Sequence, residues 1–154
     1  MVTLFDFEQN GGYALRRVPM VMRLKLDVCG LRISLAAWQA LSRDEREELV
    51  AMPFASDEQR AAFCACLTTM LAPYANDPEK AVEQVDIDPS PPWQQKDTVP
   101  QDVIDTLDAL SLPTIEQAQW ANLNELQRFA LSKLTRPGHR NAKLLPALQE
   151  FGLG

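Results

Sequence analysis

Two stretches of this sequence carry the same order of apolar and polar positions. Residues 33–49 match residues 115–131 at a constant offset, and the identical pairs include Ile33 and Ile115, Trp38 and Trp120, Leu41 and Leu123, Arg46 and Arg128, and Leu49 and Leu131. Ser42 and Asn124, both favoured helix N-caps, coincide as well. The pattern predicts in each copy a short helical turn that carries a Trp, followed by a longer amphipathic helix.

Residues 20–29 are ambiguous by pattern alone. Their apolar and polar positions alternate as they would in a strand. Pro19, however, suits the first turn of a helix, and Gly30 suits the position just after a helix ends. The length and the good helix formers of this stretch also favour a helix, so we predict a helix over residues 20–29.

Capping residues predict where the other helices begin. Ser42 with Glu45 predicts a helix that continues to about Ala51, and Ser56 with Gln59 predicts the start of the next.

In the second half, Thr114 with Gln117 has the spacing of a capping box, and it predicts the start of the turn that carries Trp120. Pro100 opens another amphipathic helix that ends near Leu110. Pro146 is tolerated only within a first turn, so the last helix must start late.

The predicted fold class is all-α, with about seven helices in two pseudo-repeated halves and at most one short N-terminal strand around Phe5 and Phe7. Residues 1–154 are long enough to form a single domain with a core of its own. Residues 74–98 are rich in proline and acidic side chains, and they predict an irregular connection between the halves. Trp93 is interpreted as an anchor for this connection, with a binding role as the alternative.

Charge is distributed unevenly along the chain. Residues 51–120 hold three basic against twelve acidic side chains, whereas residues 121–154 hold five basic against two acidic ones. The net charge of −6 argues against nucleic acid or a membrane as the partner, and it leaves room for one local anion-binding face. The N-terminus lacks the pattern of a signal peptide, and no apolar run reaches the length of a membrane span.

The cysteine and histidine content argues against a metal site. The three cysteines are odd in number, which suits a reducing cytoplasm, and the chain has one histidine. Cys64 and Cys66 are two positions apart, so on a helix they point to nearly opposite sides. We predict no metal, no cofactor and a cytoplasmic location.

The segment from Arg136 to Arg140 is the part of the chain richest in side chains suited to binding a ligand or to catalysis. It holds Arg136, His139 and Arg140 in a predicted loop, where binding residues often lie on a rigid scaffold. Cations also stabilise helix C-termini, which is the alternative role for Lys133 and Arg136. A catalytic role for His139 is disfavoured because no nucleophile or orienting carboxylate can be assigned to it.

A second basic segment, residues 16–25, precedes the first repeat. With the C-terminal loop it defines a candidate surface for an anion or an acidic partner, made of Arg17, Arg23, Lys133, Arg136, His139 and Arg140. The alternative is that these cations pair with the acidic 74–98 segment and hold it down. The repeated Trp38, Trp120, Arg46 and Arg128 are assigned structural roles, in which the arginines either hold the Trp turns through hydrogen bonds or lie on solvated helix faces.

Three parts of the chain together resemble the bacterial nitrate reductase-associated protein family: Phe5-Asp6-Phe7, the segment from Val18 to Gly30 followed by the Trp38 turn, and the segment from Leu131 to Gly152. The resemblance implies association with nitrate assimilation and gives no catalytic residues to transfer. An acidic residue commonly follows the position of His139 in that family, whereas here it is Arg140.

Two functions follow as hypotheses. The favoured one is a non-catalytic accessory protein that binds nitrate reductase or one of its maturation factors. The alternative is a binder of, or an enzyme acting on, a small anion or a phosphate-bearing cofactor, which would use the basic loop from Arg136 to Arg140.

Overall fold

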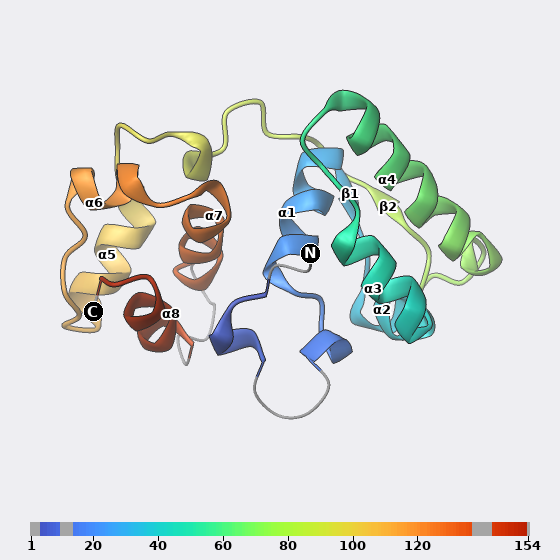
Figure 1. The fold of residues 1–154 in the computed structure, drawn as a ribbon, viewed down its shortest axis with the longest axis horizontal. Helices are drawn as coiled ribbons and strands as arrows, with labels where there is room; N and C mark the ends of the chain where they lie inside the picture. The colour runs from blue at the N-terminus through green and yellow to red at the C-terminus, as the bar shows by residue number, and fades with distance from the viewer. Residues whose placement is uncertain (1–3, 10–13, 137–142, 154) are drawn as a thin grey trace. The chain divides into compact units, whose positions relative to one another are not determined.

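The computed structural model describes residues 4–9, 14–136 and 143–153, which form an all-α fold with eight α-helices and one two-stranded sheet (Figure 1). Contacts divide the chain into two compact units. Unit 1 comprises residues 1–4 and 8–87, and unit 2 comprises residues 5–7 and 88–154. The predicted fold class is confirmed, and each unit is described below by itself.

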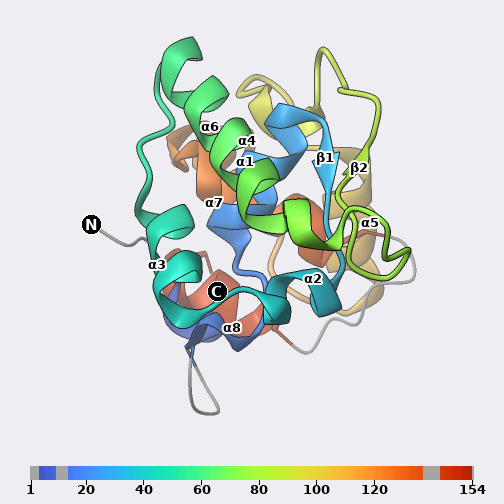
Figure 2. The ribbon, with the colours of Figure 1, turned by 90° about the vertical axis from the view of Figure 1, so that its right-hand side faces the viewer.

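Unit 1 contains four α-helices and both strands. In chain order its elements are the 3-10 helix η2 (Ala14–Arg16), α1 (Met20–Cys29), β1 (Leu31–Arg32), α2 (Leu35–Ala40), α3 (Arg43–Ala51), α4 (Asp57–Leu71), η3 (Ala72–Tyr74) and β2 (Glu83–Gln84). The strands are antiparallel, with Leu31 opposite Gln84. Helices α1, α3 and α4 pack against one another, as the turned view in Figure 2 also shows.

The helix boundaries of unit 1 confirm the capping predictions. The Ser42 and Ser56 side chains each accept a hydrogen bond from the backbone N–H three residues on, and both capping boxes are complete. Gly30 ends α1 in the left-handed conformation, with φ of 69°. A Cβ there would lie 2.7 Å from the Ile87 side chain, so glycine also allows the 85–87 segment to cross closely.

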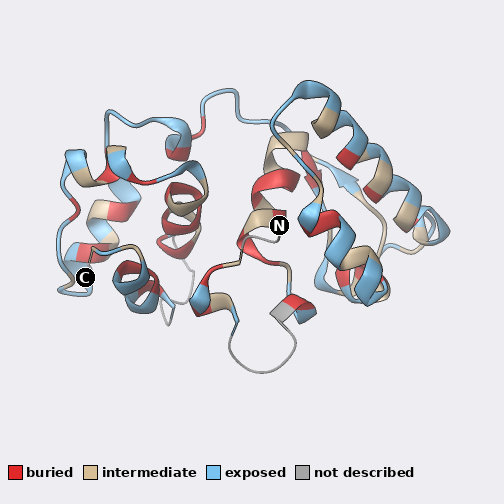
Figure 3. Cartoon of the chain, viewed as in Figure 1, coloured by how far each residue is buried: buried red, intermediate tan, exposed pale blue. Residues whose placement is uncertain are grey.

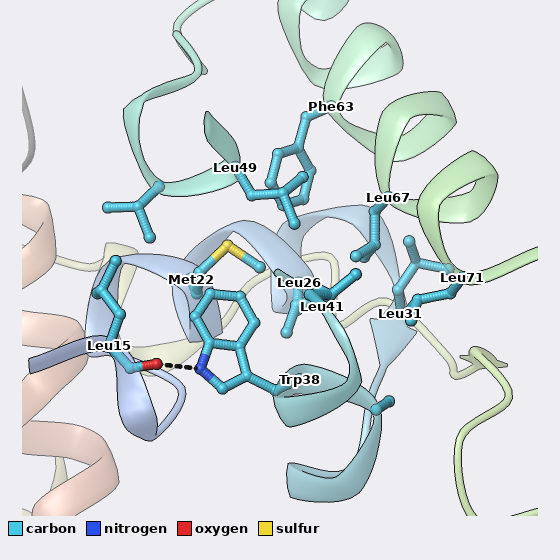
Figure 4. Close-up of a cluster of buried hydrophobic side chains, with 12 residues drawn as sticks. Leu15, Met22, Leu26, Leu31, Trp38, Leu41, Leu49, Phe63, Leu67 and Leu71 are labelled. Atoms are coloured by element: carbon cyan, nitrogen blue, oxygen red, sulfur yellow. Dashed lines mark hydrogen bonds between the residues drawn. The ribbon is translucent and has the colours of Figure 1, made fainter. Parts of the chain in front are cut away.

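The core of unit 1 is built around Trp38, which is 0% exposed. Figure 4 shows its indole among side chains from α1, α3 and α4, including Met22, Leu49 and Phe63. Burying an aromatic side chain of this size makes a large contribution to the stability of the core. The full burial of Trp38 agrees with the core position predicted for it.

Unit 2 contains the other four α-helices. Its elements are η4 (Pro92–Gln94), α5 (Gln101–Ala109), α6 (Gln117–Asn122), α7 (Glu125–Leu134) and α8 (Leu144–Glu150). Trp120 is 0% exposed, and Trp93 on η4 is buried with its ring edge-on to Phe129. The anchor role predicted for Trp93 therefore agrees with its burial, and Figure 3 shows the buried positions of both units in red.

One predicted boundary in unit 2 is wrong. Helix α6 is capped at Glu116, whose N–H donates to the Gln119 side chain, and not at Thr114. Ile115 is buried just ahead of the cap, so the helix starts only after the chain has passed this apolar anchor. Glu116 is the counterpart of Ser34, the cap of α2, so the repeat itself carried the correct signal.

The N-terminal residues form a 3-10 helix, η1 (Asp6–Glu8), where a short strand was expected. Phe5 and Phe7 belong to unit 2, are stacked on each other, and contact Phe151 just after α8. The Phe7 N–H donates to the Glu150 carboxylate at 3.1 Å instead of to a second strand. The aromatic packing and this hydrogen bond replace the strand pairing.

The two units repeat one order of elements. Each has a 3-10 helix, a longer helix, a short helix that carries a Trp, a helix that carries the matched Arg, and a further helix. The sequence repeat covered only the third and fourth of these elements. The order of the others extends the pseudo-repeat to most of each unit.

Candidate functional site

The repeated Trp and Arg of unit 1 hold the 3-10 helix η2. The Trp38 indole N–H donates to the Leu15 carbonyl oxygen at 2.7 Å, as drawn in Figure 4. The Arg46 guanidinium donates to the Leu41 carbonyl oxygen through Nε at 3.2 Å and Nη2 at 2.9 Å, and through Nη1 to Leu15 at 3.5 Å. We call this arrangement the Trp–Arg clamp.

Unit 2 repeats the Trp–Arg clamp on the 3-10 helix η4. The Trp120 indole N–H donates to the Gln95 carbonyl oxygen at 2.7 Å. Arg128 donates through Nε to the Trp93 carbonyl oxygen at 2.8 Å and through Nη1 to Leu123, the counterpart of Leu41. Arg128 is 3% exposed, whereas Arg46 is half-buried.

The clamps show what the repeated motif does. A planar guanidinium group presents several donors in a fixed fork, so one side chain can satisfy carbonyl groups from two segments. The carbonyls at the end of a short helix and in a 3-10 turn otherwise lack partners inside the protein. The repeated Trp and Arg side chains are therefore bonded to the protein's own backbone.

Lys25 lies in the basic segment of residues 16–25, but its side chain is buried. Its ammonium nitrogen lies 2.9, 2.9 and 2.8 Å from the carbonyl oxygens of Leu49, Val50 and Met52 at the C-terminal end of α3. The Phe63 ring lies 5.4 Å from the same nitrogen. Burial lowers the pKa of Lys25 to about 8.

Lys25 therefore caps α3 and is not available to a partner. Its ammonium group satisfies carbonyls that have no partner within the helix, at the end where the helix dipole favours a cation. The helical spacing of Lys25 with Met22, at i and i+3, was the signal in the sequence that it shares a buried face.

The predicted basic surface is divided between the two units. Arg17 is exposed and Arg23 is half-buried in unit 1, where the Arg23 Nε donates to the Val18 carbonyl oxygen at 3.4 Å. Lys133 and Arg136 belong to unit 2. The structure describes each pair within its own unit.

In unit 2, Lys133 and Arg136 lie at the C-terminal end of α7. The Lys133 ammonium nitrogen is 5.3 Å from the centre of the Phe129 ring, and Arg136 is exposed. Both positions suit cations, because the carbonyl end of a helix carries partial negative charge. His139 and Arg140 lie outside the described residues.

The alternative role predicted for the cations is to pair with acidic side chains of the 74–98 segment. A cation outside the candidate surface, Arg32, makes such a pair. Arg32 on β1 lies 4.0 Å from Glu83 on β2, with both side chains more than half exposed. Such an exposed pair contributes at most about 1 kcal/mol.

The three cysteines are unpaired and half-buried. No group of three or more His, Cys, Asp and Glu side chains in the described part of the chain is placed to hold a metal ion. Within the same residues, none of the helices has the length and apolar character required to span a bilayer.

Comparison with known proteins gives one match. A family model described as "conserved nitrate reductase-associated protein" matches residues 4–151. No curated protein and no solved structure matches the chain. The match includes both Trp–Arg clamps and all eight helices of the described residues.

Proposed function

Because the chain belongs to the conserved nitrate reductase-associated protein family, we propose that it is a non-catalytic accessory protein that binds nitrate reductase or one of its maturation factors. The family match over residues 4–151 is the observation that carries the proposal. It links nearly the whole chain, and not one motif of it, to nitrate reductase.

The use of the distinctive polar side chains supports a binding role. Both indole N–H groups, the two clamp arginines and the buried Lys25 donate to backbone carbonyl groups of the protein itself. Groups used in this way build a rigid scaffold that presents a surface. A partner would then contact the exposed side chains that the scaffold carries.

The exposed cations provide the chemistry for that contact. Arg17 lies between η2 and α1 in unit 1, and Arg136 follows α7 in unit 2. Guanidinium groups bind carboxylates in a two-point geometry, so the complementary surface on the partner is acidic. The cytoplasm is the proposed location, because the three unpaired cysteines suit a reducing compartment.

The test is an affinity purification of the tagged full-length protein from cells grown on nitrate. Co-purified proteins are cross-linked and identified by mass spectrometry, with cells grown on ammonium as the control. We expect nitrate reductase or a maturation factor in the nitrate sample. Recovery of neither, with the bait abundant and folded, would contradict the proposal.

Charge-reversal variants then test the surface itself. Arg17→Glu and Arg136→Glu are compared with Arg32→Glu, a matched exposed arginine outside the candidate surface. We expect the first two to weaken binding of the purified partner at least several-fold, and Arg32→Glu to leave it nearly unchanged. Equal effects of all three would show that net charge, and not this surface, determines binding.

The alternative function is tested by a thermal-shift screen with nitrate, phosphate and nucleotides. A ligand present at 100 times its dissociation constant stabilises a protein by about 2.7 kcal/mol, which such a screen detects. Under the proposed function we expect none of these anions to stabilise the protein beyond a matched chloride control. A specific shift that Arg136→Ala abolishes would favour the anion-binding function instead.

A further inference from the structure

Two cysteines from different elements meet in unit 1. Cys29 is the last residue of α1, and its Sγ lies 4.0 Å from the carbonyl oxygen of Arg60, in the first turns of α4. Helices α1 and α4 pack against each other (Figure 2). The Cys29 thiol therefore lies against the surface of α4 at the level of Arg60.

Cys64 follows Arg60 by one helical turn, on the same face of α4. Side chains on a helix tilt toward its N-terminus, so the Cys64 thiol extends over the turn that contains Arg60. Both thiols are half-buried and pack against the hydrophobic core of unit 1. The two sulfur atoms thus approach the same point from the two helices.

The protonation behaviour of Cys29 agrees with this placement. Burial, together with the charge of the neighbouring Cys64 and its hydrogen bond with Cys29, raises the pKa of the Cys29 thiol to about 12. A hydrogen bond between two thiols requires the sulfur atoms to be within contact distance.

We propose that Cys29 and Cys64 form a reversible dithiol–disulfide pair that ties the end of α1 to α4. The inference is independent of the proposed function, because it concerns thiols inside unit 1 and not the basic surface. The oxidant is a low-molecular-weight disulfide such as oxidised glutathione.

The reaction proceeds by two exchanges. The Cys64 thiolate attacks the oxidant, so that a Cys64–glutathione bond forms, the oxidant's own S–S bond breaks, and one glutathione thiolate leaves. Cys29, deprotonated, then attacks the Cys64 sulfur and releases the second glutathione thiolate. Two protein thiols are oxidised, one disulfide is reduced to two thiols, and the two protons pass to the released glutathiones.

The high pKa of Cys29 sets the conditions for the second exchange. The attacking species is the thiolate, which is scarce at neutral pH when burial raises the pKa. The internal disulfide therefore forms slowly at neutral pH and faster as the pH is raised. The pair responds to sustained oxidation and not to brief exposure.

Cys66 provides the internal control. It lies two positions from Cys64, and burial, followed by the charges of Glu48 and Glu45 on α3, raises its pKa. Its thiol thus faces α3, whereas the Cys64 thiol meets Cys29 on α1. Cys66→Ser should leave the reaction intact.

The experiment uses the reduced full-length protein, incubated with oxidised glutathione at pH 8.5. Of the three thiols, we expect one to remain titratable, and peptide mapping without reduction should recover a peptide pair joining Cys29 to Cys64. The melting temperature should rise by roughly 5–10 °C, because the cross-link closes a long loop in the unfolded chain. Dithiothreitol should reverse both changes.

Variants decide between the possible outcomes. Cys66→Ser should behave as the wild type does, and Cys64→Ser should retain its thiols or carry only glutathione adducts. If a variant does not fold, the peptide map of the wild type alone decides. A map that joins Cys64 to Cys66, that shows only disulfides between molecules, or that shows three unreacted thiols would overturn the proposal.

Discussion

Both clamp arginines donate hydrogen bonds to backbone carbonyl groups, but Arg128 is more deeply buried than Arg46. Replacing each by Met therefore tests how much burial adds to the stability that these hydrogen bonds provide. Arg128 is 3% exposed and donates to the carbonyl groups of Trp93 and Leu123. Methionine keeps most of the apolar stem while it removes the donors. Any difference between Arg128→Met and Arg46→Met then reflects the environment of the lost hydrogen bonds.

The expected cost follows from the carbonyl groups left behind. A buried acceptor that loses its partner costs about 1–3 kcal/mol, and Arg128→Met leaves two such acceptors. The two acceptors together give an expected loss of about 2–6 kcal/mol. Arg46 is half-buried, and water can replace it at its carbonyls, so Arg46→Met should cost about 1 kcal/mol.

The assay is urea denaturation of the full-length protein, with the free energy of unfolding obtained by linear extrapolation. Limited proteolysis provides a local measurement, because loss of the Arg128 clamp should free η4 and expose residues 85–98 to cleavage. Equal costs for the two variants, or a cost below about 1 kcal/mol for Arg128→Met, would refute the view that this guanidinium group anchors η4.

Three further predictions concern stability. Lys25→Met should cost about 2–4 kcal/mol, since three carbonyl groups at the end of α3 lose their donor. Because the pKa of Lys25 is about 8 in the folded state and near 10.4 in the unfolded state, the unfolded state binds more protons between these pH values, and the stability of the wild type should rise with pH there. The stability of Lys25→Met should not rise in this way, as urea titrations of both proteins at pH 7.5 and 9.5 would show. Ser42→Ala should cost about 1 kcal/mol because α3 loses its N-terminal cap. Ser132→Ala should be neutral or stabilising, because the Ser132 hydroxyl oxygen is buried without a hydrogen-bond partner among the described residues. Thermal denaturation of both variants checks this difference, and an equal loss of stability in both would contradict it. Phe7→Ala should cost about 3–5 kcal/mol and increase amide exchange in α8, and unchanged exchange there would contradict the packing described for unit 2.

The parts of the fold that the sequence predicted well depend on short spacings. The side chains of Ser42, Ser56 and Asn124 each accept a hydrogen bond from the backbone N–H three residues later, so the two residues that matter are close together in the chain. Gly30 and Pro146 act through their own backbone preferences. Signals of this kind are complete within one helical turn, and they can be interpreted without knowledge of the tertiary fold.

The parts that were missed depend on contacts between distant residues. Lys25 lies between apolar neighbours, so the sequence of α1 alternates as a strand would. In the structure the Lys25 side chain is buried with Met22 and Leu26 on one face of the helix, because it reaches carbonyl groups at the end of α3, 24 to 27 residues later in the chain. The partner of the Arg128 clamp, Trp93, is 35 residues away. Nothing local in the sequence identifies which carbonyl groups such cations reach.

The basic surface of the candidate site stays a prediction, because its described residues belong to two units. Sequence position suggested that residues 16–25 and 133–143 supply one basic surface, and it could not reveal that Lys25 points inward. The repeat, by contrast, indicated the Trp and Arg positions directly. In both units these side chains donate hydrogen bonds to equivalent backbone carbonyl groups, so the same residue types recur at the same spacing.

The packing of Phe5 and Phe7 in unit 2 has a consequence for how the protein is made. Phe7 is 143 residues ahead of Glu150, the side chain that accepts its N–H. At a synthesis rate of about 5–20 residues per second, the ribosome reaches that partner roughly 7–30 s after it has added Phe7. For all of that time Phe5 and Phe7 lack their native contacts with Phe151 and Glu150. Phe5 and Phe7 are thus buried only after the end of unit 2 has been synthesised, and until then they are an obvious place for a chaperone to bind.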